Sequence, residues 1–209
     1  MKEIIKHTCP HCNHEFDIDI YPVINLQSDT EIYNDLFSLD LFRIECEKCK
    51  KITLITYNTL VIDMYKKYII YLTADKSKDI ENLNIMNNYK DIISELKHTR
   101  SVNSLNELVE KLYIFDYDLN DKIIEYLKYG LKNNSKLQEG NYTDICFNKL
   151  DKEELIFTCF NLDNSTVIPK DIAVNINYYN DAVDTFKYNN ENIFFEQVNQ
   201  DFIEKELNK

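Results

Sequence analysis

The sequence predicts an α+β fold, with a β-rich ribbon carrying one inserted helix at residues 1–75 and a mixed helix and β-hairpin region after it. Three observations lead to this prediction. Two closely spaced cysteine pairs lie within the first 50 residues, β-type apolar runs follow both pairs, and the longer helix-type stripes lie beyond residue 100. Strand-rich and helix-rich segments are therefore separated along the chain.

The two cysteine pairs are Cys9-Pro10-His11-Cys12 and Cys46-Glu47-Lys48-Cys49. The two-residue spacing of each pair allows two thiolates to bind one metal ion, and two such pairs complete a tetrahedral site. Zinc is the usual occupant of four thiolates, and a site closed by four protein ligands is structural because it leaves no position for substrate. We therefore predict a structural Zn²⁺ on Cys9, Cys12, Cys46 and Cys49.

Alternatives exist for these and the other candidate ligands. The pairs are also compatible with inert buried thiols or with redox chemistry, although redox pairs normally open a helix after a strand. His7, His11 and His14 flank the first pair and are candidate substitutes for a cysteine ligand. Cys146 and Cys159 fall in the two strands of one predicted hairpin, where small apolar residues, a cross-strand disulfide or a further metal site are the choices.

The elements of the ribbon follow from apolar spacing. Residues 14–26 begin as a strand with an apolar residue at every second position, and Pro22 confines the segment to a sheet edge or a bulge. A capping box at residues 28–31 predicts the inserted helix. Residues 52–57 and 67–72 are predicted to be antiparallel strands, with their turn inside residues 63–67.

The second part of the chain has stronger helix signals. Residues 74–90 are polar and predict a linker or a weak helix. Ser104 and Asn120 each stand where a cap precedes an apolar stripe, so two helices should begin there. A hairpin at 142–161 and two helices at 178–188 and 199–207 complete the prediction. We place the domain boundaries at 1–75 for the ribbon, 76–134 for a helical continuation and 135–209 for the C-terminal hairpin and helices.

Composition excludes several function classes. The net charge is −12, which repels phosphate backbones and favours a protein or small-molecule partner over nucleic acid. The two glycines, Gly130 and Gly140, cannot form a Walker A loop or a dinucleotide fingerprint, and the four histidines form no H-E-x-x-H helix. Residues 116–120 begin like a calcium loop but lack its later glycine and glutamate, so an acidic helix start is favoured.

The chain also lacks membrane signals. No apolar run approaches the ~18 residues of a membrane span, and the first residues contain too short an apolar stretch for a signal peptide. We therefore expect a cytoplasmic protein with no membrane partner. Thiols stay reduced in that compartment, as a thiolate metal site requires.

One local concentration of basic and aromatic residues is a candidate nucleic-acid contact. Its members are Lys50, Lys51, Tyr65, Lys66 and Lys67, with further tyrosines nearby. Tyrosines can stack on bases and lysines can contact phosphates. However, lysines close to a four-thiolate zinc ion also offset the site's negative charge, which is a sufficient reason for their presence.

Several segments together carry a family resemblance. They are the first cysteine pair with its proline, the approach Leu39-Asp40-Leu41-Phe42-Arg43-Ile44-Glu45-Cys46, the turn Asp63-Met64-Tyr65-Lys66-Lys67, and the stretch Ser101-Val102-Asn103-Ser104-Leu105-Asn106-Glu107-Leu108. Ile114-Phe115-Asp116 and Leu119-Asn120-Asp121 continue the pattern. These residues resemble the CpXC domain proteins of bacteria over at least residues 5–127. The resemblance implies a zinc-ribbon-like fold and no particular activity, since the family is defined by its cysteines.

The chain departs from the family pattern in three places. The second pair lacks the proline that family members usually carry. Zinc-binding turns favour glycine after the second cysteine, where the backbone becomes left-handed, but this chain has Asn13 and Lys50 there. Ile62 occupies a position where family members often have histidine, so any function of that histidine is missing here.

The leading functional prediction is a non-enzymatic, zinc-stabilised module that binds a protein partner. The runner-up is a nucleic-acid-associated regulator that uses the lysine–tyrosine turn near the ribbon. An enzyme with an unrecognised site comes third. The sequence contains no recognisable catalytic set, and it determines neither the partner nor the oligomeric state.

Overall fold

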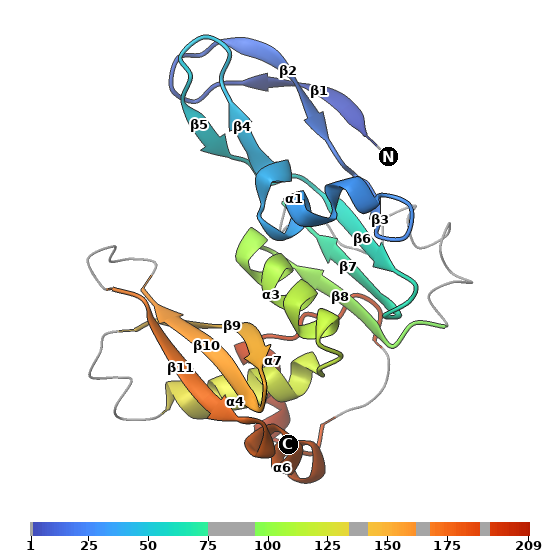
Figure 1. Ribbon diagram of the computed structural model, residues 1–209, viewed down its shortest axis with the longest axis vertical. Coiled ribbons are helices and arrows are strands. Elements are labelled where there is room, and N and C mark those ends of the chain that lie inside the picture. The colour runs from blue at the N-terminus through green and yellow to red at the C-terminus, as the bar shows by residue number, and fades with distance from the viewer. Residues whose placement is uncertain (1, 75–94, 134–141, 162–167, 189–192) are drawn as a thin grey trace. The chain divides into compact units, whose positions relative to one another are not determined.

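The computed structural model describes residues 2–74, 95–133, 142–161, 168–188 and 193–209 (Figure 1). The chain forms two compact units, Met1–Val109 with Asn192–Glu196 and Glu110–Glu191 with Gln197–Lys209. Helices and strands occur in both units, so the α+β prediction is confirmed. The boundaries predicted near residues 75 and 134, and nearly all of the predicted linker, lie outside the described residues.

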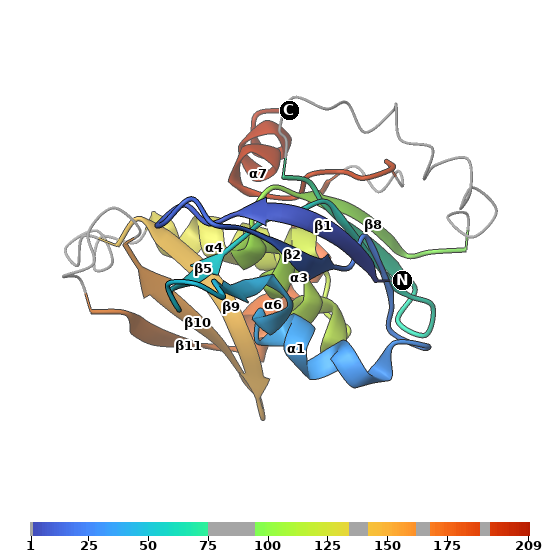
Figure 2. The ribbon, with the colours of Figure 1, turned by 90° about the horizontal axis from the view of Figure 1, so that it is seen from above.

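The ribbon of the first unit consists of two antiparallel strand pairs (Figure 2). Strand β1 (Glu3–Thr8) pairs with β2 (Glu15–Ile20), and β4 (Arg43–Glu45) pairs with β5 (Ile52–Leu54). Each pair is joined by a turn that contains one cysteine pair. The alternation predicted for β2 is confirmed, because its Phe, Ile and Ile side chains are buried and its two aspartates are exposed.

The inserted helical segment is shorter than predicted. It consists of η1 (Thr30–Ile32), α1 (Tyr33–Phe37) and η2 (Asp40–Phe42), and Leu36 is the buried residue of α1. The capping box at residues 28–31 does not form. Instead the backbone N–H of Asn25 donates to the Asp29 carboxylate at 2.8 Å, and the Ser28 N–H donates to the Asn25 carbonyl at 3.0 Å. The turn begun at Asn25 engages the groups that were predicted to cap the helix.

A four-stranded sheet forms the rest of the first unit. Its order is β3 (Val23–Asn25), β6 (Thr59–Asp63), β7 (Tyr68–Leu72) and β8 (His98–Val102). Only the central β6–β7 pair is antiparallel, and the two outer pairs are parallel. Pro22 stands just before the edge strand β3, as its lost N–H requires.

The predicted pairing of residues 52–57 with 67–72 is wrong. The partner of β7 is β6, which is buried at all five positions, whereas β5 pairs with β4 in the ribbon. Ile52 and Leu54 are exposed, which suits a two-stranded pair better than a central sheet position. Residues 52–54 and 59–63 are both apolar and lie close together in the sequence, so their composition did not indicate which one would be buried in the core sheet.

A distant segment completes this sheet's core. Phe195 packs in one cluster with Leu60, Ile69 and Tyr71, and its ring centroid lies 5.9 Å from that of Tyr71. The Ser101 N–H donates to the Glu196 carbonyl at 3.3 Å, and a parallel bridge joins Arg100 to Glu196. The first unit is therefore built from two separate parts of the chain.

The second unit combines three strands with helices. Helix α3 (Leu105–Asp116) begins in the first unit, and α4 (Asp121–Lys132), α6 (Ile176–Thr185) and α7 (Gln200–Leu207) lie wholly in the second. The sheet order is β11 (Lys170–Asn175), β10 (Glu154–Phe160), β9 (Asp144–Asp151). The predicted hairpin is confirmed as β9–β10, and both predicted C-terminal helices are present.

Both predicted helix caps also form. The Ser104 hydroxyl accepts the Glu107 N–H at 3.2 Å, and the Asn120 side chain accepts the Lys122 N–H at 2.9 Å.

Among the described helices none is long and apolar enough to cross a bilayer.

Two lysines and three carboxylates form a buried ion network in the second unit. Lys128 Nζ lies 2.8 Å from both carboxylate oxygens of Glu110 and 3.0 Å from Glu125. Lys111 Nζ lies 3.3 Å from the same Glu125 oxygen and 3.2 Å from Asp121. Side chains from α3 and α4 thus neutralise one another where water is largely excluded.

The network is held in place by the sheet and by its own charges. The Phe147 N–H of β9 donates to Glu110 Oε1 at 2.6 Å. Burial alone lowers the pKa of Lys128, but the carboxylates of Glu110 and Glu125 outweigh burial and hold that pKa above its ordinary value. Removal of one charge should therefore leave an uncompensated opposite charge inside the unit.

We predict that Lys128→Met lowers the free energy of unfolding of this unit by about 3–5 kcal/mol, because Glu110 and Glu125 lose their shared cation. Native-state hydrogen exchange of the α4 amides measures the effect. Lys149→Met, at an exposed position of β9, is the matched control and should stay within about 0.5 kcal/mol. Adding Glu110→Gln and Glu125→Gln to Lys128→Met should restore most of the loss; a loss below about 1 kcal/mol in the single variant would contradict the analysis.

Candidate metal centre

The two cysteine turns have the same backbone hydrogen bonds. In the first, the Asn13 N–H donates to the Cys9 carbonyl at 2.9 Å, and the Cys9 N–H donates to the His14 carbonyl at 2.9 Å. In the second, the Lys50 N–H donates to the Cys46 carbonyl at 2.9 Å, and the Cys46 N–H donates to the Lys51 carbonyl at 3.0 Å. Each turn closes the end of one ribbon pair, so the cysteines are positioned by backbone geometry and by the flanking strands.

The residue after each second cysteine has a left-handed backbone. The φ angle is 55° at Asn13 and 59° at Lys50. Asparagine tolerates this conformation, whereas lysine is strained there by roughly 1–2 kcal/mol because its Cβ approaches the carbonyl oxygen. The absence of glycine at position 50 therefore strains the backbone of the second turn and lowers its stability.

The four sulfur atoms fit a tetrahedral metal site. Cys9 Sγ lies 3.7 Å from Cys49 Sγ, Cys12 Sγ lies 3.6 Å from Cys46 Sγ, and all four sulfurs are within 4.8 Å of one another. A disulfide requires about 2.05 Å, so these cysteines are unpaired thiols. Metal–sulfur bonds of about 2.3 Å in a tetrahedron give sulfur separations of about 3.8 Å. The cluster is thus close enough to hold a metal ion.

The protonation chemistry of the cluster also favours a cation. Hydrogen bonds from the backbone N–H groups of Cys49 and Lys48 outweigh burial and lower the pKa of Cys46 to about 6. At Cys12 the backbone N–H of His14 acts in the same direction, but burial and hydrogen bonds with the neighbouring thiols outweigh it and raise the pKa to about 12. Thiols this close cannot all ionise together without a positive charge between them.

The flanking histidines are not part of the cluster. The four cysteines are the only group of three or more metal-ligating side chains among the described residues. The rings of His7 and His14 instead contact Phe16, with centroids 5.6 and 5.9 Å away. Residues 116–120 are among those described and form no such group, so the structure gives no support to a calcium loop there.

The remaining cysteines lie in the second unit and do not pair. Cys146 stands opposite Thr158 in the β9–β10 register, and Cys159 stands opposite Ile145. Cys146 and Cys159 therefore point to opposite faces of the sheet. Both are unpaired thiols, and burial raises the pKa of Cys146 to about 12. A cross-strand disulfide is excluded by this register.

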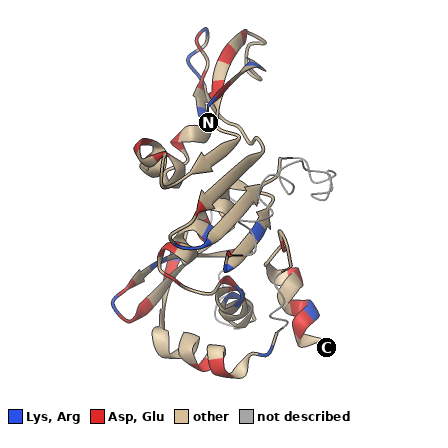
Figure 3. Cartoon of the chain, turned by 90° about the vertical axis from the view of Figure 1, so that its right-hand side faces the viewer, with Lys and Arg blue, Asp and Glu red and all other residues tan. Residues whose placement is uncertain are grey.

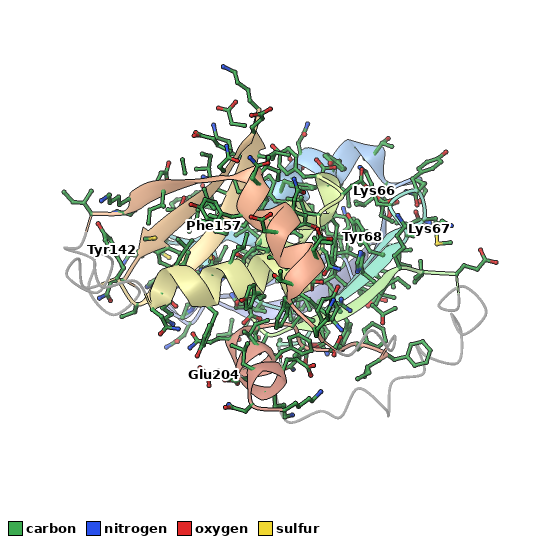
Figure 4. The ribbon with its side chains drawn as sticks, turned by 90° about the horizontal axis from the view of Figure 1, so that it is seen from below. Lys66, Lys67, Tyr68, Tyr142, Phe157 and Glu204 are labelled. Atoms are coloured by element: carbon green, nitrogen blue, oxygen red, sulfur yellow. The ribbon has the colours of Figure 1, made fainter. Side chains whose placement is uncertain are left out.

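The lysine–tyrosine candidates are brought together only in part. Tyr65 is 85% exposed in the β6–β7 turn, where Lys66 and Lys67 follow it. Figure 4 shows Lys66 and Lys67 close to Tyr68. Tyr68 and Tyr71, however, are core residues and cannot stack on bases. Lys50 and Lys51 belong to the second cysteine turn, at the opposite end of the first unit in Figure 1. Lys50 also pairs with Glu45 at 3.2 Å.

We predict that Lys50→Gly stabilises the metal-loaded protein by about 0.5–1 kcal/mol, because relief of left-handed strain exceeds the backbone entropy cost of glycine. Thermal unfolding of the loaded protein measures the change. Lys51→Gly is the matched control: its φ is not positive, so glycine there should only destabilise, by roughly 0.5–1 kcal/mol. Equal effects of the two substitutions would contradict the strain argument.

We also predict one tightly bound divalent metal ion per chain, held by all four sulfurs. Elemental analysis of protein purified without added metal should give about one equivalent. Cys46→Ser should lose the metal and unfold the ribbon, since a hydroxyl is a poor replacement for thiolate. Cys146→Ser removes a cysteine outside the site and should keep the full equivalent; less than about half an equivalent in the unaltered protein would refute the site.

A family model described as CpXC protein matches residues 7–128. No curated protein and no solved structure matches the chain. The matched residues include both cysteine pairs, the β6–β7 turn and the caps at Ser104 and Asn120, and they make up more than half of the 209 residues. The chain belongs to the CpXC protein family.

Proposed function

We propose that Cys9, Cys12, Cys46 and Cys49 bind one structural Zn²⁺, and that this chain is a non-enzymatic module that binds a protein partner in the bacterial cytoplasm. The observation that carries the proposal is the cluster of four sulfurs within 4.8 Å, drawn from two turns more than 30 residues apart. Four thiolates favour zinc among common cellular metals, because soft sulfur ligands in tetrahedral geometry suit it. When bound, zinc would supply a fixed cross-link between the two strand pairs.

The site supports a structural role better than a catalytic one. A catalytic zinc site keeps an open position for water or substrate, whereas the protein offers four sulfurs with tetrahedral spacing here. The cross-link would hold two short strand pairs rigidly, and rigid strands present side chains and backbone to a partner at low entropic cost. Reduced thiols are consistent with the cytoplasm.

A nucleic-acid function is the second candidate, on one observation. Tyr65 is 85% exposed and directly precedes Lys66 and Lys67 in the β6–β7 turn, a combination that can stack on a base and contact phosphate. The net charge of −12 opposes it. The burial of Tyr68 and Tyr71 also removes the extended stacking surface that the sequence had indicated.

One experiment separates the two candidates. Cross-linking of the tagged full chain in its native cell should recover a stoichiometric protein partner, and Cys46→Ser should lose that partner while Cys146→Ser keeps it. In parallel, electrophoretic shifts at low salt should show no binding to single-stranded or duplex probes. Tight, salt-sensitive binding that is abolished by Lys66→Glu with Lys67→Glu would favour the nucleic-acid regulator instead.

A further inference from the structure

Each strand of the ribbon's two strand pairs has one open edge, because each sheet contains only two strands. Strand β2 is hydrogen-bonded only to β1, and β4 only to β5, within the part of the chain that the structure describes. An open edge has backbone N–H and C=O groups that can pair with another strand. Proteins usually protect such edges, and those they leave open are common sites for binding an extended peptide.

A cleft lies between these two open edges. It has a volume of about 320 Å³ and is lined by consecutive residues of both strands, Phe16 to Asp19 of β2 and Arg43 to Glu45 of β4. Consecutive residues of a strand point to alternate faces, so a cleft that contacts all of them runs along the strand edges. Phe16, Ile18 and Leu41 supply buried apolar surface to it.

The lining of the cleft is acidic. Five carboxylates border it against one guanidinium, that of Arg43; the acidic residues are Asp17, Asp19, Asp40, Glu45 and Glu47. Figure 3 shows both acidic (red) and basic (blue) segments along the strands of the ribbon. A ligand with apolar and basic side chains in alternation would match both the apolar surface and the acidic border.

Existing ion pairs do not block such a ligand. Four of the five carboxylates already have a basic partner: Asp19 with Lys2 at 2.8 Å, Asp17 with Lys6 at 3.7 Å, Asp40 with Arg43 at 3.1 Å and Glu45 with Lys50 at 3.2 Å. All eight side chains are about half exposed or more. Exposed pairs contribute little, so a ligand's lysines can replace these partners. The carboxylates would then pair with the ligand's lysines, whose positions are fixed by the backbone hydrogen bonds of the added strand.

We propose that an extended, lysine-rich segment of a protein partner binds as an added strand in the cleft between β2 and β4. The added strand would pair with both open edges and join the two strand pairs into one continuous sheet. An added strand of six residues, about 20 Å long, could pair along the whole of β2, and three of its residues could pair with β4. The proposal rests on the proposed function, because a metal ion on the four cysteines would hold the two edges at a fixed separation.

Synthetic peptides test the proposal on the full, zinc-loaded chain. The protein contains no tryptophan, so a peptide of alternating valine and lysine with one terminal tryptophan reports binding by its own fluorescence. We expect saturable one-to-one binding, with amide chemical shifts confined to residues 15–20 and 40–47. The same peptide with glutamate in place of lysine should bind at least about tenfold more weakly, since its charge has the wrong sign.

Two further comparisons separate strand addition from simple charge attraction. A lysine peptide that is N-methylated at alternate residues cannot donate along one edge, so it should also bind at least about tenfold more weakly. Asp17→Asn with Asp19→Asn should weaken binding of the unmodified peptide by roughly tenfold at low salt. The matched control, Glu153→Gln with Glu154→Gln, neutralises two exposed carboxylates of the other unit and should bind normally.

Each other outcome overturns the proposal. Absent binding at millimolar peptide, equal binding of the N-methylated peptide, or shifts outside residues 15–20 and 40–47 would each reject strand addition. Concentration-dependent dimers in sedimentation, with the same residues shifted, would assign the cleft to a second copy of this chain. If the native partner is still recovered with the Asp17→Asn, Asp19→Asn variant, the cleft proposal fails while the protein-binding function stands; if no metal-dependent partner is recovered at all, the function itself fails.

Discussion

The structure of the ribbon depends on four sulfur atoms that meet from two distant turns. Each strand pair has only two strands, and an isolated two-stranded sheet is marginally stable in water. Ile4, Ile52 and Leu54 remain exposed, so apolar burial on β1 and β5 adds little. A metal ion on the sulfurs would close the chain between Cys12 and Cys46 and replace the missing core, since structural zinc in small fingers is worth on the order of 10–16 kcal/mol.

The sequence predicted those elements whose signals are local. Ser104 and Asn120 cap their helices as expected, and the alternation from Phe16 to Ile20 forms the predicted strand. Strand partners were harder to predict, because pairing is decided by which run is buried. Residues 52–54 and 59–63 are both apolar, yet only the second lies in the core sheet. Strands β1, β3, β6, β8 and β11 were not predicted, because apolar spacing alone did not mark them as strands.

The candidate site shows the same division. Cysteine spacing was enough to predict the cluster, whose geometry fits a metal ion, although the metal itself stays a prediction. Tyrosine positions were not enough: Tyr65, Tyr68 and Tyr71 share one short segment, but two of them are core residues. Likewise Glu110 and Lys128 resemble ordinary helix-surface charges in the sequence, and only the tertiary fold reveals that they are buried together. Polar residues in the interior are visible to sequence reasoning only when their partners are adjacent.

The return of Phe195 to the first unit's core has a consequence for synthesis of the chain. Strand β8 leaves the ribosome about 90 residues before Phe195. At about 5–20 residues per second this interval lasts roughly 5–20 s. During this interval the nascent sheet has an open edge at β8, and Tyr71 lacks the Phe195 ring that later packs against it. Chaperones bind exposed apolar surface of this kind, and aggregates form on it. The N-terminal unit is therefore begun first but completed only near the end of synthesis.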